Sequence, residues 1–423
     1  MKHNFRIVIG MLLFAIPLCI NAQVRPTKPK QEPKKVQVEK TEAEKLEKEK
    51  AKKEEKEKKE KGRNPFNSDM LKFSGFVQGM YQANLSDEGE LTSNTFRMRR
   101  VRLSAEGTLF KGLTYKIQGD FSRSPMLVDA FVKYKVADAF AIQLGQFKTP
   151  FSLESPINPV NLEIFDYGEG IQKLVGYSDV CGVGGIGRDI GLMATGKLFA
   201  IKDGEEVKYH VVDYALGVFN GNGPTTTDNN NRKDIVGRLE VHPGLKALTL
   251  SGSYYHGLYK NSTVEAEIKD LVDGKEEFGD KTSLEKFGNG NRNRWAAGLQ
   301  YNDGSLVIRG EYISGRTGLQ NLTIDTLDVV AKTDVSIVSN GYYGVIGYNF
   351  KLGKEGKQSL MPVLRYEHFT QNADITKGGT NWYTVGVNYW PIKSLNFKLD
   401  YSLIQKESGS NSHRVVGILS YKF

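Results

Sequence analysis

A row of arginines marks the segment FRMRRVRLSAEG, residues 96–107. Its four guanidiniums belong to Arg97, Arg99, Arg100 and Arg102. From Arg100 onward polar and apolar residues alternate, and this period of two predicts a β-strand with one polar face. A guanidinium keeps its positive charge and binds carboxylate or phosphate oxygens through paired N–H donors. We therefore expect a strand that presents arginines to anions or to acidic side chains.

The first 22 residues predict that this strand lies outside the cytoplasm. A short basic segment precedes an apolar run from Ile7 to Ile20, and Ala22 offers a small residue for cleavage. This pattern is typical of a signal peptide, residues 1–22, because the apolar run is too short for a spanning helix. Cys181 is then the only cysteine of the mature chain, so we expect no internal disulfide.

Positive charge is concentrated in the N-terminal part of the chain. The formal net charge is +9, but residues 25–63 hold 16 Lys or Arg against 10 Glu, and residues 64–423 carry only +1. Residues 23–66 are rich in Pro, Lys and Glu, which predicts a solvated, charged spacer rather than a coiled coil. Because the basicity lies in this segment, we expect no nucleic-acid partner.

From residue 67 to residue 423 the chain consists of short alternating segments rich in Gly, Tyr, Phe and Thr. Each is about as long as the 9 to 11 residues of a tilted membrane strand. Residues 128–136, with Val128 and Val132 facing lipid, and residues 395–403 are examples. Sixteen such segments can be recognised, although the phase of residues 207–219 is ambiguous. The fold class that we expect is all-β, a transmembrane antiparallel β-barrel of about 16 strands.

The connections between these segments alternate in length. Short links near residues 111, 302 and 391 alternate with long ones at 148–187, 257–293 and 314–340. Short turns on one side and long loops on the other are typical of a bacterial outer-membrane barrel. A secreted sheet in lipid must close on itself to pair every backbone group, which disfavours the alternative of a soluble periplasmic β-protein. The chain ends on Phe423, in a pattern that resembles the signature recognised by barrel-assembly machinery.

Several stretches resemble the phosphate-selective porins of the O/P type. The matching pieces are FRMRRVRLSAEGTLFKGLTYKIQGDFS, LVDAFVKYK, LGQFKTPFSLE and GRDIGLMATG, and the resemblance extends over most of residues 70–423. It implies a trimeric 16-stranded channel in the outer membrane of a Gram-negative bacterium, with the spacer in the periplasm. It also implies a third outer loop, residues 148–187, folded into the pore. The middle of that loop, residues 161–180, carries four acidic residues against Lys173, which departs from what a phosphate constriction needs; they are Glu163, Asp166, Glu169 and Asp179.

The polar faces of the predicted strands would line water inside the barrel. The basic residues that we assign to an anion pathway are Arg100, Arg102, Lys116, Arg238, Arg309, Arg365 and Lys398. Basic side chains that each bind an anion weakly would let it enter the pore and also leave. Arg97 and Arg99 fall in the opposite phase, so we place them at an outer lip or beside a bulge.

A structural role competes with this interpretation. Acidic residues share the same faces, for example in the pairs Arg238/Glu240 and Arg365/Glu367. Such neighbours could form a salt-bridged wall that stiffens the barrel. We favour the wall role for a single lumen arginine and the anion role for Arg100 and Arg102, because two basic groups there precede one carboxylate.

The function that we expect is passive diffusion of small hydrophilic solutes, chiefly anions such as phosphate. Two alternatives remain: a general or oligosaccharide porin, with Tyr255, Phe369 and Trp382 as a sugar track, and an adhesin or receptor that acts through its long outer loops. An enzyme is not expected, because none of the five mature histidines has an evident serine partner. The glycine-rich GVGGIG at 182–187 is followed by a predicted strand, not a helix, so we expect no nucleotide cofactor and no metal.

Overall fold

The computed structural model describes residues 69–423 except 184, 261–281, 287–288, 325–329 and 354–355. The predicted signal peptide and spacer therefore lie outside the described residues. The strands are β1 (Lys72–Ser86), β2 (Leu91–Phe110), β3 (Leu113–Asp120), β4 (Leu127–Ala137), β5 (Phe140–Lys148), β6 (Arg188–Asp203), β7 (Glu206–Phe219), β8 (Asp234–Val241), β9 (Leu248–Lys260), β10 (Thr282–Lys286), β11 (Asn289–Asn302), β12 (Leu306–Ile324), β13 (Val330–Tyr348), β14 (Phe350–Leu352), β15 (Gln358–Thr370), β16 (Gly379–Ile392), β17 (Leu395–Lys406) and β18 (Ser412–Lys422). Two short helices, η1 (Pro159–Asn161) and α3 (Glu169–Val175), lie between β5 and β6.

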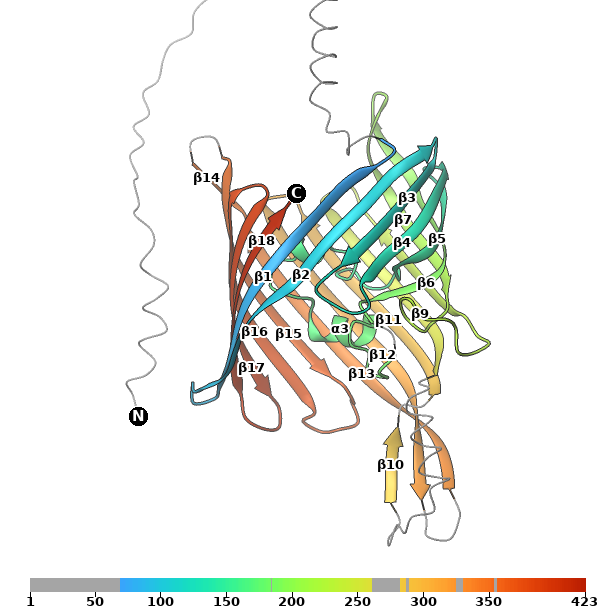
Figure 1. Ribbon diagram of the computed structural model, residues 1–423, viewed down its shortest axis with the longest axis vertical. Coiled ribbons are helices and arrows are strands. Elements are labelled where there is room, and N and C mark those ends of the chain that lie inside the picture. Colours follow the sequence, from blue (N-terminus) through green and yellow to red (C-terminus); the bar gives the residue numbers. More distant parts are fainter. Residues whose placement is uncertain (1–68, 184, 261–281, 287–288, 325–329, 354–355) are drawn as a thin grey trace, which may run out of the picture. The chain divides into compact units, whose positions relative to one another are not determined.

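These strands form one closed antiparallel barrel (Figure 1). Each strand pairs with its sequence neighbours, and β1 pairs with β18 to complete the ring. Of the 18 strand segments, β10 and β11 both pair with β12, and β13 and β14 both pair with β15. Each of these two pairs of segments counts as one strand of the wall, so the wall has 16 strands. The predicted number and direction of the strands are confirmed. No helix in the described part of the chain is both long and apolar enough to cross a bilayer.

The two ends of the barrel differ as predicted. At the short-turn end, brief turns join β2 to β3, β6 to β7 and β16 to β17, and the chain finishes there with Phe423 (Figure 1). At the long-loop end, β5 and β6 are separated by residues 149–187, and β7 and β8 by residues 220–233. Short turns at one end and long loops at the other are typical of an outer-membrane barrel.

Two predicted loops are shorter than the sequence indicated. We expected connections at 257–293 and 314–340, but β9 continues to Lys260, and β12 and β13 pair without interruption from Leu306↔Tyr348 to Ile324↔Val330. In sequence, these extensions mix Gly, Ser, Thr and Asn with scattered apolar residues and lack a regular alternation. A pattern that is read from lipid-facing residues therefore misses strands that continue beyond the bilayer.

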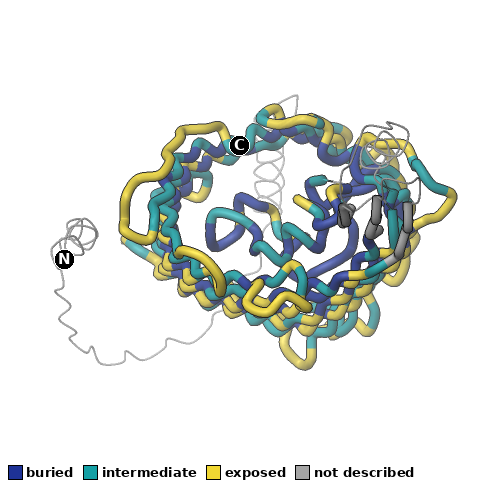
Figure 2. Tube along the Cα trace, turned by 90° about the horizontal axis from the view of Figure 1, so that it is seen from below, coloured by how far each residue is buried: buried dark blue, intermediate teal, exposed yellow. Residues whose placement is uncertain are grey.

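Apolar residues cover the outside of the barrel. Leu364, Val385 and Leu399, all predicted to face lipid, are 57%, 56% and 44% exposed. Figure 2 shows exposed segments around the outer rim and buried segments within the ring. One predicted lipid-facing residue, Val128, is instead fully buried. A bulge between the pairs Gln118↔Asp129 and Gly119↔Leu127 leaves Val128 unpaired in the ladder and changes the phase of the strand there.

Candidate permeation pathway

The loop between β5 and β6, which contains α3, folds into the barrel (Figure 1), and Figure 2 shows chain crossing the interior of the ring. The apolar side chains of the loop form a core with inward residues of the wall, so a packed apolar layer fills part of the lumen. The loop contributes Phe151, Leu162, Ile164, Tyr167, Ile171, Leu174, Val175 and Val180 to this cluster. Tyr255 and Phe369 belong to the same cluster and are 5% and 6% exposed. The rings suggested as a sugar track therefore include two that pack against the loop.

The first polar anchor of the loop is Glu154, whose side chain is fully buried. Its Oε1 accepts from Arg365 Nη1 at 2.5 Å and lies 3.5 Å from Arg309 Nη2. Its Oε2 accepts from the backbone N–H of Gly168 at 3.1 Å, which ties two parts of the loop together. Burial alone would raise the pKa of the Glu154 carboxyl, but Arg365 and Arg309 hold that pKa below its ordinary value.

A second anchor fixes the middle of the loop to β12 and β17. Glu163 pairs with Arg309, and Lys398 donates to the backbone carbonyls of Leu162 and Ile164, the latter at 2.9 Å. Arg309 and Lys398 were both assigned to the anion pathway from sequence, and they are 1% and 4% exposed. In the structure these two cations bind the loop.

A third anchor lies after α3. Asp179 accepts from Nη1 and Nη2 of Arg294, both at 2.7 Å, in a two-pronged pair on β11. Arg294 also donates to the carbonyl of Leu174 at 2.7 Å, at the C-terminal end of the helix. Arg292 lies beside it, bonded to Asp234 at 2.7 Å. Arg292 and Arg294 were not predicted from sequence. Their strand has few apolar residues before Trp295, so alternation does not indicate which of its side chains face the lumen.

Arg99 and Arg100, from the arginine-rich segment of residues 96–107, contact the loop at a fourth anchor. Asp166 pairs with Arg99 and with Arg100, the latter at 3.2 Å. Burial would raise the pKa of the Asp166 carboxyl, but Arg99 and then Arg100 hold it below its ordinary value. The predicted outer-lip position of Arg99 is therefore wrong: its side chain lies inside the barrel and is 7% exposed.

A β-bulge explains the phase of the arginine row. Gln78 pairs with Arg100, but the next residue of β1, Gly79, pairs with Met98, so Arg99 has no opposite residue. The bulge restarts the alternation, and Arg97 then pairs with Met80, which faces the interior and is 3% exposed. Arg97 thus shares the inner face and not an outer lip. A bulge inserts one extra residue into a strand, so a prediction that assumes a strict period of two assigns the residues beyond it to the wrong face.

The remaining predicted pathway residues pair with acids of the wall. Arg102 Nε donates to Asp120 at 3.0 Å in a fully buried pair. Lys116 lies 3.2 Å from Glu106, and both are partly exposed. Arg238 lies 3.2 Å from Glu240 and donates to the carbonyl of Ser152 at 3.3 Å. Wall pairing and loop anchoring thus engage every residue assigned to the anion pathway.

Comparison with known proteins identifies the family. The model of the phosphate-selective porin O and P family matches residues 71–418. The chain belongs to this porin family. Family and fold together indicate a channel in the outer membrane. No curated protein sequence matches the chain.

Solved porins share the fold of this porin at low sequence identity. They include an anion-selective porin from Comamonas acidovorans (TM-score 0.53, 13% identity, 84% of this chain and 99% of that one). OmpF of Salmonella typhi, in complex with daunomycin, gives a TM-score of 0.52 at 14% identity, with 84% and 97% covered. The trimer form of OmpT from Vibrio cholerae gives 0.51 at 11% identity, with 84% and 99% covered.

Five buried arginine Nε–H donors have no hydrogen-bond partner among the described residues of this porin; they belong to Arg99, Arg292, Arg294, Arg309 and Arg414. Arg99 and Arg414 differ from the other three because both contact the ring of Phe165, with guanidinium carbons 5.4 and 4.5 Å from its centre. Buried N–H donors are normally paired, so these two have the capacity to donate to an oxyanion without breaking another bond.

Proposed function

We propose that this porin gives passive diffusion to small hydrophilic solutes and that anions such as phosphate are preferred. The observation that supports the preference is the group formed by Arg99, Arg100 and Arg414, beside the single carboxylate of Asp166 and the ring of Phe165. Two guanidiniums share one carboxylate, and two N–H donors stay unpaired. An anion that reached this group would gain charge-assisted hydrogen bonds without displacing a loop anchor.

Other arginines of the wall serve the pathway indirectly under this proposal. Arg309, Arg365 and Arg294 hold the loop, and the loop positions Phe165 and Asp166 against β2 and β18. The acidic loop, which seemed unsuited to a phosphate constriction, is neutralised because Glu154, Glu163, Asp166 and Asp179 each pair with wall arginines. The weak site that remains is what conduction needs, because a tightly held ion would block the pore.

The same proposal includes a homotrimer with its spacer in the periplasm. Support for the trimer comes from OmpT of Vibrio cholerae, which shares this fold and has a trimer form. The first described strand, β1, begins at the short-turn end beside the last residues of β18, and short turns face the periplasm in such barrels. Phe423 remains our proposed contact for barrel-assembly machinery, and it is exposed at that end.

The test is the zero-current potential of the purified porin in planar bilayers under a KCl gradient, with and without added phosphate. We expect an anion-selective potential and a chloride current that phosphate reduces. Arg99→Gln and Arg414→Gln should each weaken the phosphate effect several-fold, whereas Lys135→Gln, an exposed residue paired with Asp138, should not.

Other outcomes point to the alternatives. An unselective or cation-selective potential would favour a general or oligosaccharide porin. A barrel that folds but does not conduct would favour an adhesin or receptor. Phosphate sensitivity that survives both arginine substitutions would reject the assignment of the site while leaving the channel function intact.

A further inference from the structure

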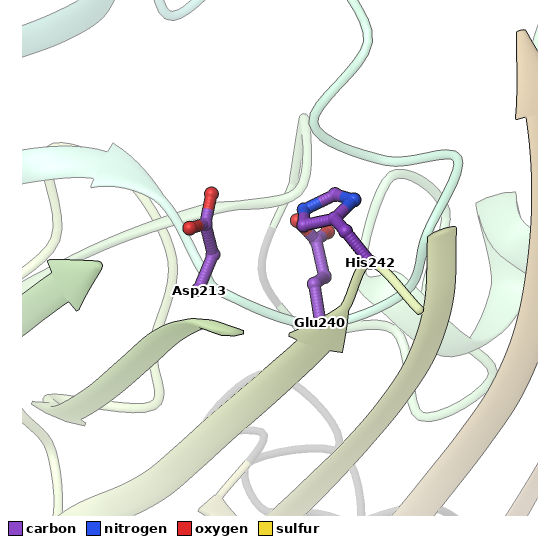
Figure 3. Close-up of side chains that lie close together, drawn as sticks. All are labelled: Asp213, Glu240 and His242. Atoms are coloured by element: carbon purple, nitrogen blue, oxygen red, sulfur yellow. The ribbon is translucent and has the colours of Figure 1, made fainter. Parts of the chain in front are cut away.

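A second cluster of side chains lies on the inner wall, on β7 and β8. Asp213 and Glu240 stand directly opposite each other in the antiparallel ladder, and His242 follows the last residue of β8. Figure 3 shows the His242 ring beside the Glu240 carboxylate, with the Asp213 carboxylate across from them. One ligand atom from each of the three lies within 4.8 Å of the other two.

Each carboxylate of this cluster has one oxygen committed to a cation and one available. Lys197 Nζ lies 3.0 Å from Oδ2 of Asp213, while Oδ1 of Asp213 is buried and has no hydrogen-bond partner in the described part of the chain. Arg238 Nε lies 3.2 Å from Oε1 of Glu240, and Oε2 is the oxygen left over. A cation placed between the strands would therefore find one oxygen from each residue.

The hydrogen bonds of His242 prepare its ring for the same ion. Nδ1 lies 3.2 Å from the carbonyl oxygen of Leu248 and 3.2 Å from Oγ1 of Thr249. A carbonyl only accepts, so Nδ1 carries the hydrogen, and in the neutral ring Nε2 keeps its lone pair. Histidines that bind metals usually donate their other N–H to a backbone carbonyl or carboxylate, which fixes the tautomer in this way.

We propose that Asp213, Glu240 and His242 bind one divalent transition-metal ion, with Zn²⁺ as the type case. Two carboxylate oxygens and one imidazole nitrogen suit ions of this class better than Mg²⁺ or Ca²⁺, which select oxygen ligands. Three protein ligands leave a fourth position open to water. Lys197 is 59% exposed, so its ion pair is weak and moves aside readily.

A bound ion changes the charge of the adjacent lumen. Asp213 and Glu240 line a pocket of about 300 Å³, together with Lys133, Lys197 and Arg238. Without metal the two carboxylates offset the positive charge of Lys197 and Arg238. With metal the pocket becomes strongly positive, so cations are repelled and anions are attracted at the short-turn end.

Binding is tested on the folded barrel in detergent, stripped of metal with a chelator and titrated calorimetrically with ZnCl₂ near pH 7.5. We expect one saturable site, and at least a tenfold loss of affinity in His242→Gln. The matched control is His256→Gln, because His256 is exposed on β9 and bonds Asn293 Oδ1. Each variant is first shown to fold by its circular dichroism and by the heat-dependence of its electrophoretic mobility.

A second readout reports the ligands directly. Co²⁺ in the same site should give an absorption spectrum that is altered in His242→Gln and in Asp213→Asn but unchanged in His256→Gln. The proposal fails if wild type shows no saturable Zn²⁺ binding up to millimolar concentration, or if His242→Gln binds as wild type does. These measurements need no conduction, so they stand apart from the test of the channel.

Discussion

At the scale of single residues, the arginines of the inner wall mainly bind carboxylates of the loop and hold it in place. Glu154 is the clearest case, because one buried carboxylate serves Arg309, Arg365 and the backbone of Gly168. The composition of the loop shows that carboxylates are present, but it does not show that they meet these arginines. Such pairs join residues about as far apart as 154 and 365, and no local pattern carries that information.

Replacing Glu154 by Gln should destabilise the porin strongly. Two guanidiniums would lose their shared charge partner in a buried site, and breaking buried pairs of this kind costs about 3–5 kcal/mol. Urea unfolding in lipid vesicles, followed by tryptophan fluorescence, measures the change. Asp138→Asn removes an exposed pair with Lys135 and should leave the midpoint in place. Equal midpoints for both variants would contradict the anchoring role.

Cys181 should be inert in the folded porin. Burial, and then the nearby charge of Asp179, raise the pKa of its thiol to about 12, so almost no thiolate exists at pH 8. A maleimide or disulfide reagent at pH 8 should label the urea-unfolded chain at least a hundredfold faster than the folded one. Labelling of both at the same rate would show that this part of the loop opens. The sequence identified Cys181 only as a single cysteine without a disulfide partner, whereas in the structure the thiol lies in a buried cluster with Val183 and Tyr259.

At the scale of elements, the strands were predictable and their phase was less so. Alternation identified the wall because lipid imposes an apolar outer face on every spanning strand. It failed at Arg99 and at Val128, where bulges insert one residue, and in residues 207–219, whose phase stayed ambiguous. The cluster of Asp213, Glu240 and His242 was missed for that reason. The register of β7 on β8 would have revealed it.

At Gly168 the backbone of the loop lies close to side chains of the wall. A Cβ at this position would lie 2.2 Å from Nη2 of Arg365 and 2.6 Å from Oε2 of Glu367. Gly168→Ala should therefore push the loop away from β15 and change single-channel conductance measurably, by tens of per cent. The matched control is Gly185→Ala in the same loop, where a Cβ meets no atom within 4 Å. A conductance change of equal size in both variants would reject the contact as its cause.

At the scale of the whole molecule, the fold depends on one seam between the first and last strands. The backbone of Gly75 exchanges hydrogen bonds with Phe423 at 3.0 and 3.1 Å, which pairs the final residue with β1. The sequence suggested a role for Phe423 as a terminal signal, and the number of strands implied closure. The sequence could not show that the ring of Phe423 lies over Gly75.

Gly75→Val should weaken this seam. A Cβ there would lie 2.4 Å from the carbonyl oxygen of Arg102 and 2.7 Å from the ring of Phe423. We expect a lower thermal midpoint in the heat-modifiable mobility assay, by an overpacking penalty of about 1–3 kcal/mol. Gly79→Ala lies on the same strand with nothing within 4 Å of its Cβ and should behave as wild type. Wild-type mobility of Gly75→Val would show that the seam tolerates the side chain.

The long reach of the loop anchors has a consequence for the order of folding. Residues 149–187 are made early, but their partners on β12, β15 and β17 follow between 146 and 236 residues later. Contacts of such large sequence separation form slowly, because the chain between them must first be ordered. Of the four anchors, only the pair of Asp166 with Arg99 and Arg100 on β2 lies on a strand made before the loop. The loop therefore cannot dock completely until most of the wall exists. We infer that its burial is among the last events of assembly, so a nascent barrel passes through a stage with a wider, unplugged interior.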